Sequence, residues 1–378
     1  MDFVFQKTGV FIFFIFIGVL LKFKFHSKDE ILGIKKIILN LALPATIFIA
    51  LMGVTIEPSL LALPLLALLL NCLSFFVFPF LLPLLGVTKD SPNYRTARLL
   101  MPSLAPGLSC FPFVLEFLGE SYLAKAAMAD LGNKVFVLIF LYFIAMNWHY
   151  RLVRQKQAKK LIRLGGMLKI LIAEPINLFI FSALLFLGFG VNMESIPFIF
   201  KDSLEKLSLI MTPLVLLFIG LAVKIKKEQF FQVFSLLCFR ASFVVLLSGI
   251  FVAVSGISNS KDILLLLAFG LSSCSFWPYA HISTVDNLEK ANKPKHKTFN
   301  SDFAIAILAL SFPFSTLLIL GLLNSGTTVT SYANIFLFGM LLGAMGLVLH
   351  FFNNWTKMAK AQKLVNPKLD ASVSDHLS

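Results

Sequence analysis

An acidic and a basic residue lie four positions apart within an otherwise apolar stretch of the chain. Asp130 and Lys134 both fall in the segment 121–147, and a spacing of four places two side chains on one face of a helix. Charged groups are costly inside a bilayer and are therefore rare in membrane-spanning helices. Two interpretations stay open: the pair is structural and neutralises itself, or it is functional. In the functional case, Lys134 meets a ligand carboxylate or Asp130 takes up a proton.

Two other apolar stretches contain residues that interrupt helices. Residues 101–112 hold three prolines and one glycine, and residues 270–281 hold three serines followed by Pro278. Proline removes an N–H donor and clashes with the preceding turn, so neither stretch is expected to keep an unbroken helix. Freed backbone groups within a membrane must face a cavity or other protein, and the N-termini of half-helices attract anions. The alternative is a simple proline kink with small residues for close packing.

Because the two interrupted stretches occupy corresponding positions in the chain, we favour a binding site where they meet. Its candidate residues are Pro106, Gly107, Ser109, Cys110, Pro112, Ser273, Ser275, Trp277, Pro278, Tyr279 and His281.

Several single residues allow two interpretations each. Asp302 lies either at the membrane interface or in a transport path. Arg240 either extends to the lipid head groups or lines an entrance. His281 is either a packing residue or a titrating one, and Trp277 and Tyr279 are either pocket walls or core.

The composition is that of a membrane protein. Of 378 residues, 58% are hydrophobic and 14% are charged, whereas soluble proteins carry about 25% charged residues. Apolar runs of roughly 20 residues recur, each long enough to cross a bilayer, and they are continuous rather than alternating, which predicts helices. The four cysteines are widely separated in apolar segments, so we expect free thiols, no metal site and no cofactor.

Eleven membrane-spanning helices are predicted. They are 8–24, 36–54, 59–85, 97–118, 121–147, 170–190, 204–223, 229–257, 262–285, 300–323 and 333–352. Lysine and arginine concentrate in alternate connections, which the positive-inside rule places in the cytoplasm. The rule predicts an inner or plasma membrane protein with its N-terminus outside and its C-terminus inside. The net charge of +14 is explained by these loops, and no nucleic-acid-binding motif accompanies it.

Short motifs recur about 170 residues apart along the chain. The matched pairs are Pro44 with Pro213, Pro112 with Pro278, Asp130 with Asp302, and Gly18 with Gly188. Five spans in each copy force the second copy to run upside down, and inverted repeats are typical of secondary transporters. The expected organisation is a first five-helix repeat at 1–148, a basic cytoplasmic loop at 149–169, a second, inverted repeat at 170–325, an additional helix at 326–352 and a polar cytoplasmic tail at 353–378.

These motifs resemble the auxin efflux carrier family of permeases over residues 5–325. The resemblance is carried by residues 111–120 (Phe-Pro-Phe-Val-Leu-Glu-Phe-Leu-Gly-Glu), 129–133 (Ala-Asp-Leu-Gly-Asn) and 213–221 (Pro-Leu-Val-Leu-Leu-Phe-Ile-Gly-Leu). It implies an architecture like that of bile-acid carriers and sodium/proton antiporters, with two broken helices that cross, and it adds Asn133 to the candidate site. Ala105-Pro106-Gly107 stands where the family has Asn-Thr-Gly, so the family's amide is absent here.

The resemblance and the repeats together predict a carrier of small organic anions that works by alternating access. Bacterial members of the family are similar to carriers of malate or malonate, and plant members carry auxin. A sodium-coupled symporter of the bile-acid type and a membrane sensor or scaffold are the alternatives. An enzyme is not expected, because the six histidines are scattered and form no cluster with acidic residues. Proton or sodium coupling and a homodimer stay open.

Overall fold

The computed structural model describes residues 3–25, 27–54, 57–153, 169, 172–222, 230–292 and 297–352. Within these ranges the chain is helical almost throughout, and its only β interaction is an isolated antiparallel bridge between Ala105 and Ser273. The predicted all-α class is therefore confirmed for this part of the chain. Most of the predicted basic loop at 149–169 and the whole tail at 353–378 lie outside the described residues.

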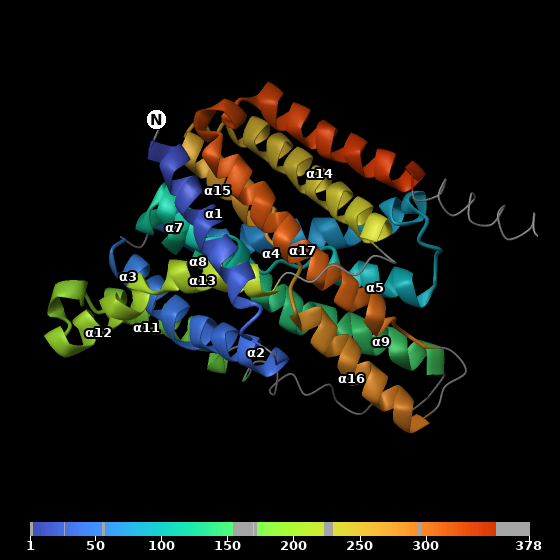
Figure 1. Cartoon of the computed structure of the whole chain (residues 1–378), viewed down its shortest axis with the longest axis horizontal. Helices are drawn as coiled ribbons and strands as arrows, with labels where there is room; N and C mark the ends of the chain where they lie inside the picture. The colour runs from blue at the N-terminus through green and yellow to red at the C-terminus, as the bar shows by residue number, and fades with distance from the viewer. Residues whose placement is uncertain are drawn as a thin grey trace, which may run out of the picture.

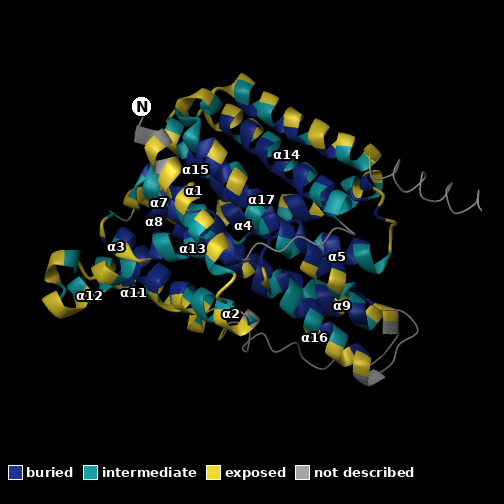
Figure 2. Ribbon diagram, viewed as in Figure 1, coloured by how far each residue is buried: buried dark blue, intermediate teal, exposed yellow. Residues whose placement is uncertain are grey.

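Seven of the described helical stretches are long and apolar enough to cross a membrane. They are Asp29–Met52, Pro58–Leu81, Glu120–Leu152, Phe198–Leu221, Phe230–Ser255, Ser301–Asn324 and Tyr332–Phe352. Two shorter apolar helices, Gly9–Leu21 and Pro175–Gly188, accompany them. Many residues on the outer helices are exposed (Figure 2). They include large apolar side chains such as Phe80, Val254 and Val348. Such a surface suits a multi-pass membrane protein, whose outer side chains meet lipid.

One group of helices packs around α1 and α3. Its members are α1 (Phe3–Leu21), α2 (Lys28–Ile37), η1 (Ile38–Ala42), α3 (Leu43–Met52), α11 (Pro175–Gly188), α12 (Phe198–Leu209) and α13 (Met211–Ala222). Here α1 packs along α13, and α3 packs against α11 and α12 (Figure 1). The crossing of α1 and α13 is close because a Cβ on Gly18 would lie 2.3 Å from the Leu217 carbonyl oxygen.

Most of the remaining described helices form a second group. Its members are α4 (Pro58–Leu81), α5 (Pro92–Leu100), α6 (Pro106–Ser109), α7 (Phe111–Leu118), α8 (Glu120–Val135), η3 (Phe136–Phe140), α9 (Leu141–Val153), α14 (Phe230–Ser255), α15 (Ser260–Gly270), α16 (Trp277–Asn292) and α17 (Ser301–Asn324). Helix α4 packs along α8, and a Cβ on Gly132 would lie only 1.8 Å from the Pro64 carbonyl oxygen. The two groups meet mainly where α3 contacts α8.

Both stretches that were predicted to be interrupted are broken. Helix α5 ends at Leu100 and α6 begins at Pro106, while α15 ends at Gly270 and α16 begins at Trp277. The extended segments 101–105 and 271–276 run antiparallel and pair at Ala105 and Ser273. The half-helix α7 therefore lies beside α15, and α5 lies beside α16 (Figure 1). The interruption is a crossing of two extended segments, and a simple proline kink is excluded.

Candidate functional site

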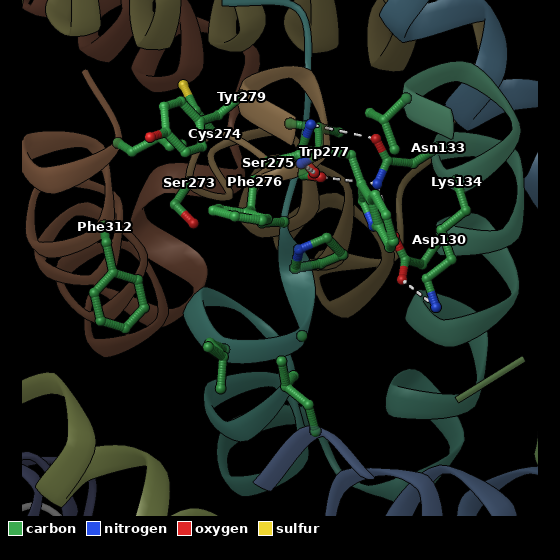
Figure 3. Close-up of a pocket in the computed structure, with 18 of the residues that line it drawn as sticks. Asp130, Asn133, Lys134, Ser273, Cys274, Ser275, Phe276, Trp277, Tyr279 and Phe312 are labelled. Carbon is green, nitrogen blue, oxygen red and sulfur yellow. Dashed lines mark hydrogen bonds and ion pairs between the residues drawn. The ribbon is translucent and has the colours of Figure 1, made fainter. Parts of the chain in front are cut away.

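A cavity of about 430 Å³ lies at the crossing of the broken helices. Its walls come from the two extended segments and from α2, η1, α6, α8, η3, the start of α11, α13, α16 and α17. Nine of the predicted site residues line it: Pro106, Gly107, Asp130, Asn133, Lys134, Ser273, Ser275, Trp277 and Tyr279. Figure 3 shows the charged pair of α8 on one side of the cavity and Phe312 of α17 on the other.

The other predicted site residues do not line this cavity. Cys110 and Pro112 are buried at the start of α7, and Pro278 is buried in the first turn of α16. The His281 ring lies 2.8 Å from the Val137 carbonyl oxygen and packs against Tyr142, as expected of a packing histidine.

Asp302 is far less enclosed than its repeat partner Asp130. It lies in the first turn of α17 and is exposed. A carboxylate in that position stabilises the helix N-terminus. The structure therefore does not bring Asp302 to the cavity.

Serine hydroxyl oxygens accept hydrogen bonds from the backbone N–H groups that have no helical partner at the crossing. Ser109 Oγ accepts from the Ser273 N–H at 3.0 Å, Ser103 Oγ accepts from the Ser275 N–H at 3.0 Å, and Ser311 Oγ accepts from the Cys274 N–H at 3.3 Å. Buried backbone donors without partners are costly, so these hydroxyls make the extended conformation stable. Ser109 thus acts within the crossing and not on the cavity wall.

Arg240 of α14 supplies the matching donors for the freed carbonyl groups. Its Nε donates to Met101 O at 2.7 Å, and its Nη2 donates to Ser103 O at 3.1 Å and to Ser272 O at 2.7 Å. The side chain is 1% exposed. Both sequence-based interpretations of Arg240 were therefore wrong, since it neither extends to head groups nor lines an entrance. Its cation lies where α5 and α15 end, and positive charge is favourable at helix C-termini.

Asn133 holds the first extended segment against α8. Its Oδ1 accepts from the Leu104 N–H at 3.2 Å, and its Nδ2 donates to Leu104 O at 2.9 Å and to Asp130 Oδ1 at 2.8 Å. Asn71 of α4 donates to the same Oδ1 at 3.0 Å. The amide side chain pairs with Leu104 as a neighbouring strand would, and it fixes the orientation of the Asp130 carboxylate.

Lys134 is surrounded by three oxygen-bearing groups. Its Nζ lies 3.4 Å from Asp130 Oδ2, 3.4 Å from Glu174 Oε2 and 2.9 Å from Asn177 Oδ1. Asp130 and Lys134 share a helix face as predicted, but Glu174 and Asn177 come from the start of α11. The ion pair is therefore part of a cluster of three charged residues, Asp130, Lys134 and Glu174, and this cluster joins the two groups of helices.

Two charged residues that line the cavity were missed from the sequence. Lys35 precedes the π-helical η1 and lies one turn before Leu39, which also lines the cavity. The neighbouring Lys36 made the pair look like an ordinary basic loop. Glu174 directly precedes Pro175 at the start of α11, a position that resembles a simple helix boundary.

The rest of the cavity wall is mostly apolar and aromatic. Phe276 comes from the second crossing segment, and Trp277 and Tyr279 come from the start of α16. Phe218 and Phe312 come from α13 and α17. The Lys35 Nζ lies 5.4 Å from the centre of the Phe276 ring. No cluster of three or more metal-binding side chains occurs among the described residues. The arrangement suits a small ligand with a negatively charged group and an apolar body.

No protein-family model matches the chain, and no curated protein sequence matches it significantly.

Proposed function

We propose that this protein is a secondary carrier of small organic anions, such as mono- or dicarboxylates, and that the cavity at the crossing of the broken helices binds the anion. The observation that carries the proposal is a cavity lined by two lysines, Lys35 and Lys134, at an antiparallel crossing of two interrupted helices. Discontinuous helices that meet near the membrane midplane are typical of transporter binding sites.

The architecture of a transporter is supported by the arrangement of the two helix groups. The crossing, α4, α8, α14 and α17 belong to one group, while α1, α3, α11 and α13 belong to the other. We propose that these groups move relative to each other, and that each group contains helices from both of the inverted five-span repeats. The additional helix 332–352 follows the second repeat. The resemblance to the auxin efflux carrier family is part of the same proposal. Eleven spans, with the N-terminus outside, complete the proposed topology.

Recognition of an anion is supported by the charges that line the cavity. Among the described residues, no carboxylate lies within ion-pair distance of Lys35. An ammonium group in a low-dielectric cavity interacts strongly with an anion. The aromatic walls would hold the apolar part of a carboxylate. Binding of the anion directly to backbone N–H groups contributes less than the sequence suggested. Serine hydroxyl oxygens already accept hydrogen bonds from several of these N–H groups.

The test is exchange transport by the purified protein in proteoliposomes. Labelled malate, malonate and phenylacetate would be loaded inside, and the same unlabelled acid would be added outside. We expect exchange of at least one of these acids and its loss in Lys35→Gln, while Lys36→Gln serves as the neighbouring control. Exchange that equals that of protein-free vesicles for every acid would contradict the proposal.

A further inference from the structure

Among the described residues, three oxygen-bearing groups already surround the Lys134 ammonium group. An ammonium group carries three donors, and three acceptors surround this one at 2.9 Å to 3.4 Å, on Asn177, Asp130 and Glu174. An anion that binds Lys134 must therefore displace one of them. The structure indicates which one is displaced, because the three groups differ in their exposure and in their other contacts.

Glu174 is the most accessible of the three acceptors. Its side chain is 21% exposed, while that of Asp130 is 4% exposed and is also held by Asn133. Asn177 is fully buried. Glu174 lines the cavity from the start of α11. Apart from Lys134, the described residues give its carboxylate one further contact, a long hydrogen bond of 3.4 Å from Asn177 Nδ2. An arriving carboxylate would therefore take the place of Glu174 beside Lys134.

The charges on the cavity wall cancel before an anion arrives. The charged lining residues are Lys35 from α2, Asp130 and Lys134 from α8, and Glu174 before α11. The other titratable lining residues are Cys274 and Tyr279. An added carboxylate brings one uncompensated negative charge into a cavity of low dielectric, where such charge is costly. Protonation of the displaced Glu174 restores neutrality.

A proton fits this cluster better than a metal cation does. Lys134 Nζ lies at 3.4 Å from each of the two carboxylates, so the ammonium group already occupies the place between them. A sodium ion would need that place and several free oxygen ligands. A proton needs only one carboxylate oxygen.

We infer that Glu174 is the proton-binding group of the carrier and that one proton is taken up with each substrate carboxylate at Lys134. This inference rests on the proposed function. The substrate carboxylate replaces the Glu174 carboxylate beside the Lys134 ammonium group, and the proton from solution forms an O–H bond on Glu174. The exchange also removes an ionic contact between α8 and α11, which belong to different helix groups. Uptake of the proton and the anion therefore favours separation of the groups.

Titration calorimetry of the purified full-length protein tests the inference. Malonate, malate and phenylacetate are each titrated at pH 7 in two buffers of different ionisation enthalpy, so that the number of protons taken up per bound anion is measured. We expect about one proton per anion, because one carboxylate changes its protonation state. Glu174→Gln should bind the anion with no proton uptake. Glu194→Gln changes an exposed glutamate in the short 3-10 turn η4 (Met193–Ser195), which follows α11, and this variant should behave as the wild type does.

The outcomes separate this inference from the proposed function. Binding or exchange without proton uptake, or proton uptake that persists in Glu174→Gln, would overturn the role of Glu174 and leave the carrier in place. Affinity that depends on sodium and not on pH would also overturn it. Absence of both binding and exchange for every acid would overturn the carrier itself, and the inference with it. If Glu174→Gln does not fold, the wild-type proton count and the pH dependence of Glu174→Asp decide the question.

Discussion

Side chains complete the hydrogen bonding of the two broken helices. Arg240 donates to carbonyl groups of both extended segments, and Asn133 pairs with the N–H and C=O groups of Leu104. In a membrane, water cannot take over these roles, and each unpaired buried group costs about 1–3 kcal/mol. These two residues therefore act as positioning residues for the cavity.

Replacement of Arg240 by alanine should destabilise the protein strongly. The change leaves three buried carbonyl oxygens without their donor, and we expect a loss of roughly 3 kcal/mol or more in the free energy of unfolding. Arg240→Lys should recover only part of it, since one ammonium group has a different shape from the guanidinium fork. Thermal unfolding in detergent measures the effect.

The matched control is Arg151→Ala, which removes an exposed arginine at the end of α9. It should change the midpoint of thermal unfolding very little. Equal midpoints for Arg240→Ala and Arg151→Ala would show that the crossing does not depend on the Arg240 contacts.

Neutral variants of the α8 pair distinguish structure from function. Lys134→Gln leaves the Asp130 and Glu174 carboxylates facing each other without their shared cation, so we expect a loss of about 3–5 kcal/mol in stability. The double variant Asp130→Asn/Lys134→Gln should regain much of this loss. It should still fail to exchange carboxylates, because the cation that would bind them is gone.

Thermal unfolding and proteoliposome exchange on the same preparations provide the two readouts. A double variant that exchanges anions as fast as the wild type would make the pair purely structural. The cavity would then rely on Lys35 for its positive charge.

At the scale of the helices, close crossings without intervening side chains fix the position of α8. Gly132 lies one residue before Asn133 and two before Lys134, and its backbone rests against Pro64 of α4. In membranes, helices associate through such close backbone packing, because lipid removes most of the hydrophobic driving force. The packing of α8 on α4 therefore fixes the position of Asp130 and Lys134 relative to the rest of their helix group.

Gly132→Ala should separate α8 from α4. A Cβ at that position would lie 1.8 Å from the Pro64 carbonyl oxygen, so the helix must move, at a cost of about 1–3 kcal/mol or more. Anion exchange should fall as well, because Asn133 and Lys134 move with the helix. The control is Gly33→Ala in α2, where nothing lies within 4 Å of the added Cβ and alanine favours the helix.

These effects are measured as the unfolding midpoint and the exchange rate of the two alanine variants. A wild-type midpoint for Gly132→Ala would contradict the close crossing of α8 and α4.

For the whole molecule, the two groups of helices meet over a limited contact that includes the cavity. The ionic cluster joins α8 to α11, and α3 packs against α8 beside it. By contrast, the contacts within each group are extensive, as between α1 and α13 or between α4 and α8. This division suits a carrier that exposes its site alternately to the two sides of the membrane.

The proposed topology predicts which loops are reached from each side. Single-cysteine variants at Lys156 and Lys368 should react with a membrane-impermeant maleimide only from the cytoplasmic side, and a cysteine in 324–331 only from outside. The physical reason is the excess of lysine and arginine in the alternate connections. Labelling of both Lys156→Cys and a position in 324–331 from outside would refute the topology.

The sequence by itself determined the all-α class and the two interruptions. Long apolar runs predict helices, because in lipid the backbone must form all its hydrogen bonds internally. The prolines of 101–112 and the serines and proline of 270–281 predict where two of these helices are interrupted. The shared face of Asp130 and Lys134 also followed from their spacing of four. Both kinds of property depend on residues that are close in the sequence.

Only the tertiary structure decided which polar groups meet across the molecule. Arg240 reaches carbonyl groups about 30 and about 140 positions away, and Glu174 meets Lys134 because α11 packs near α8. Asp302, which matches Asp130 in the repeat, remained exposed. Sequence periodicity reports which face of a helix a residue occupies, but the partner of that face is set by the packing of helices far apart in the chain.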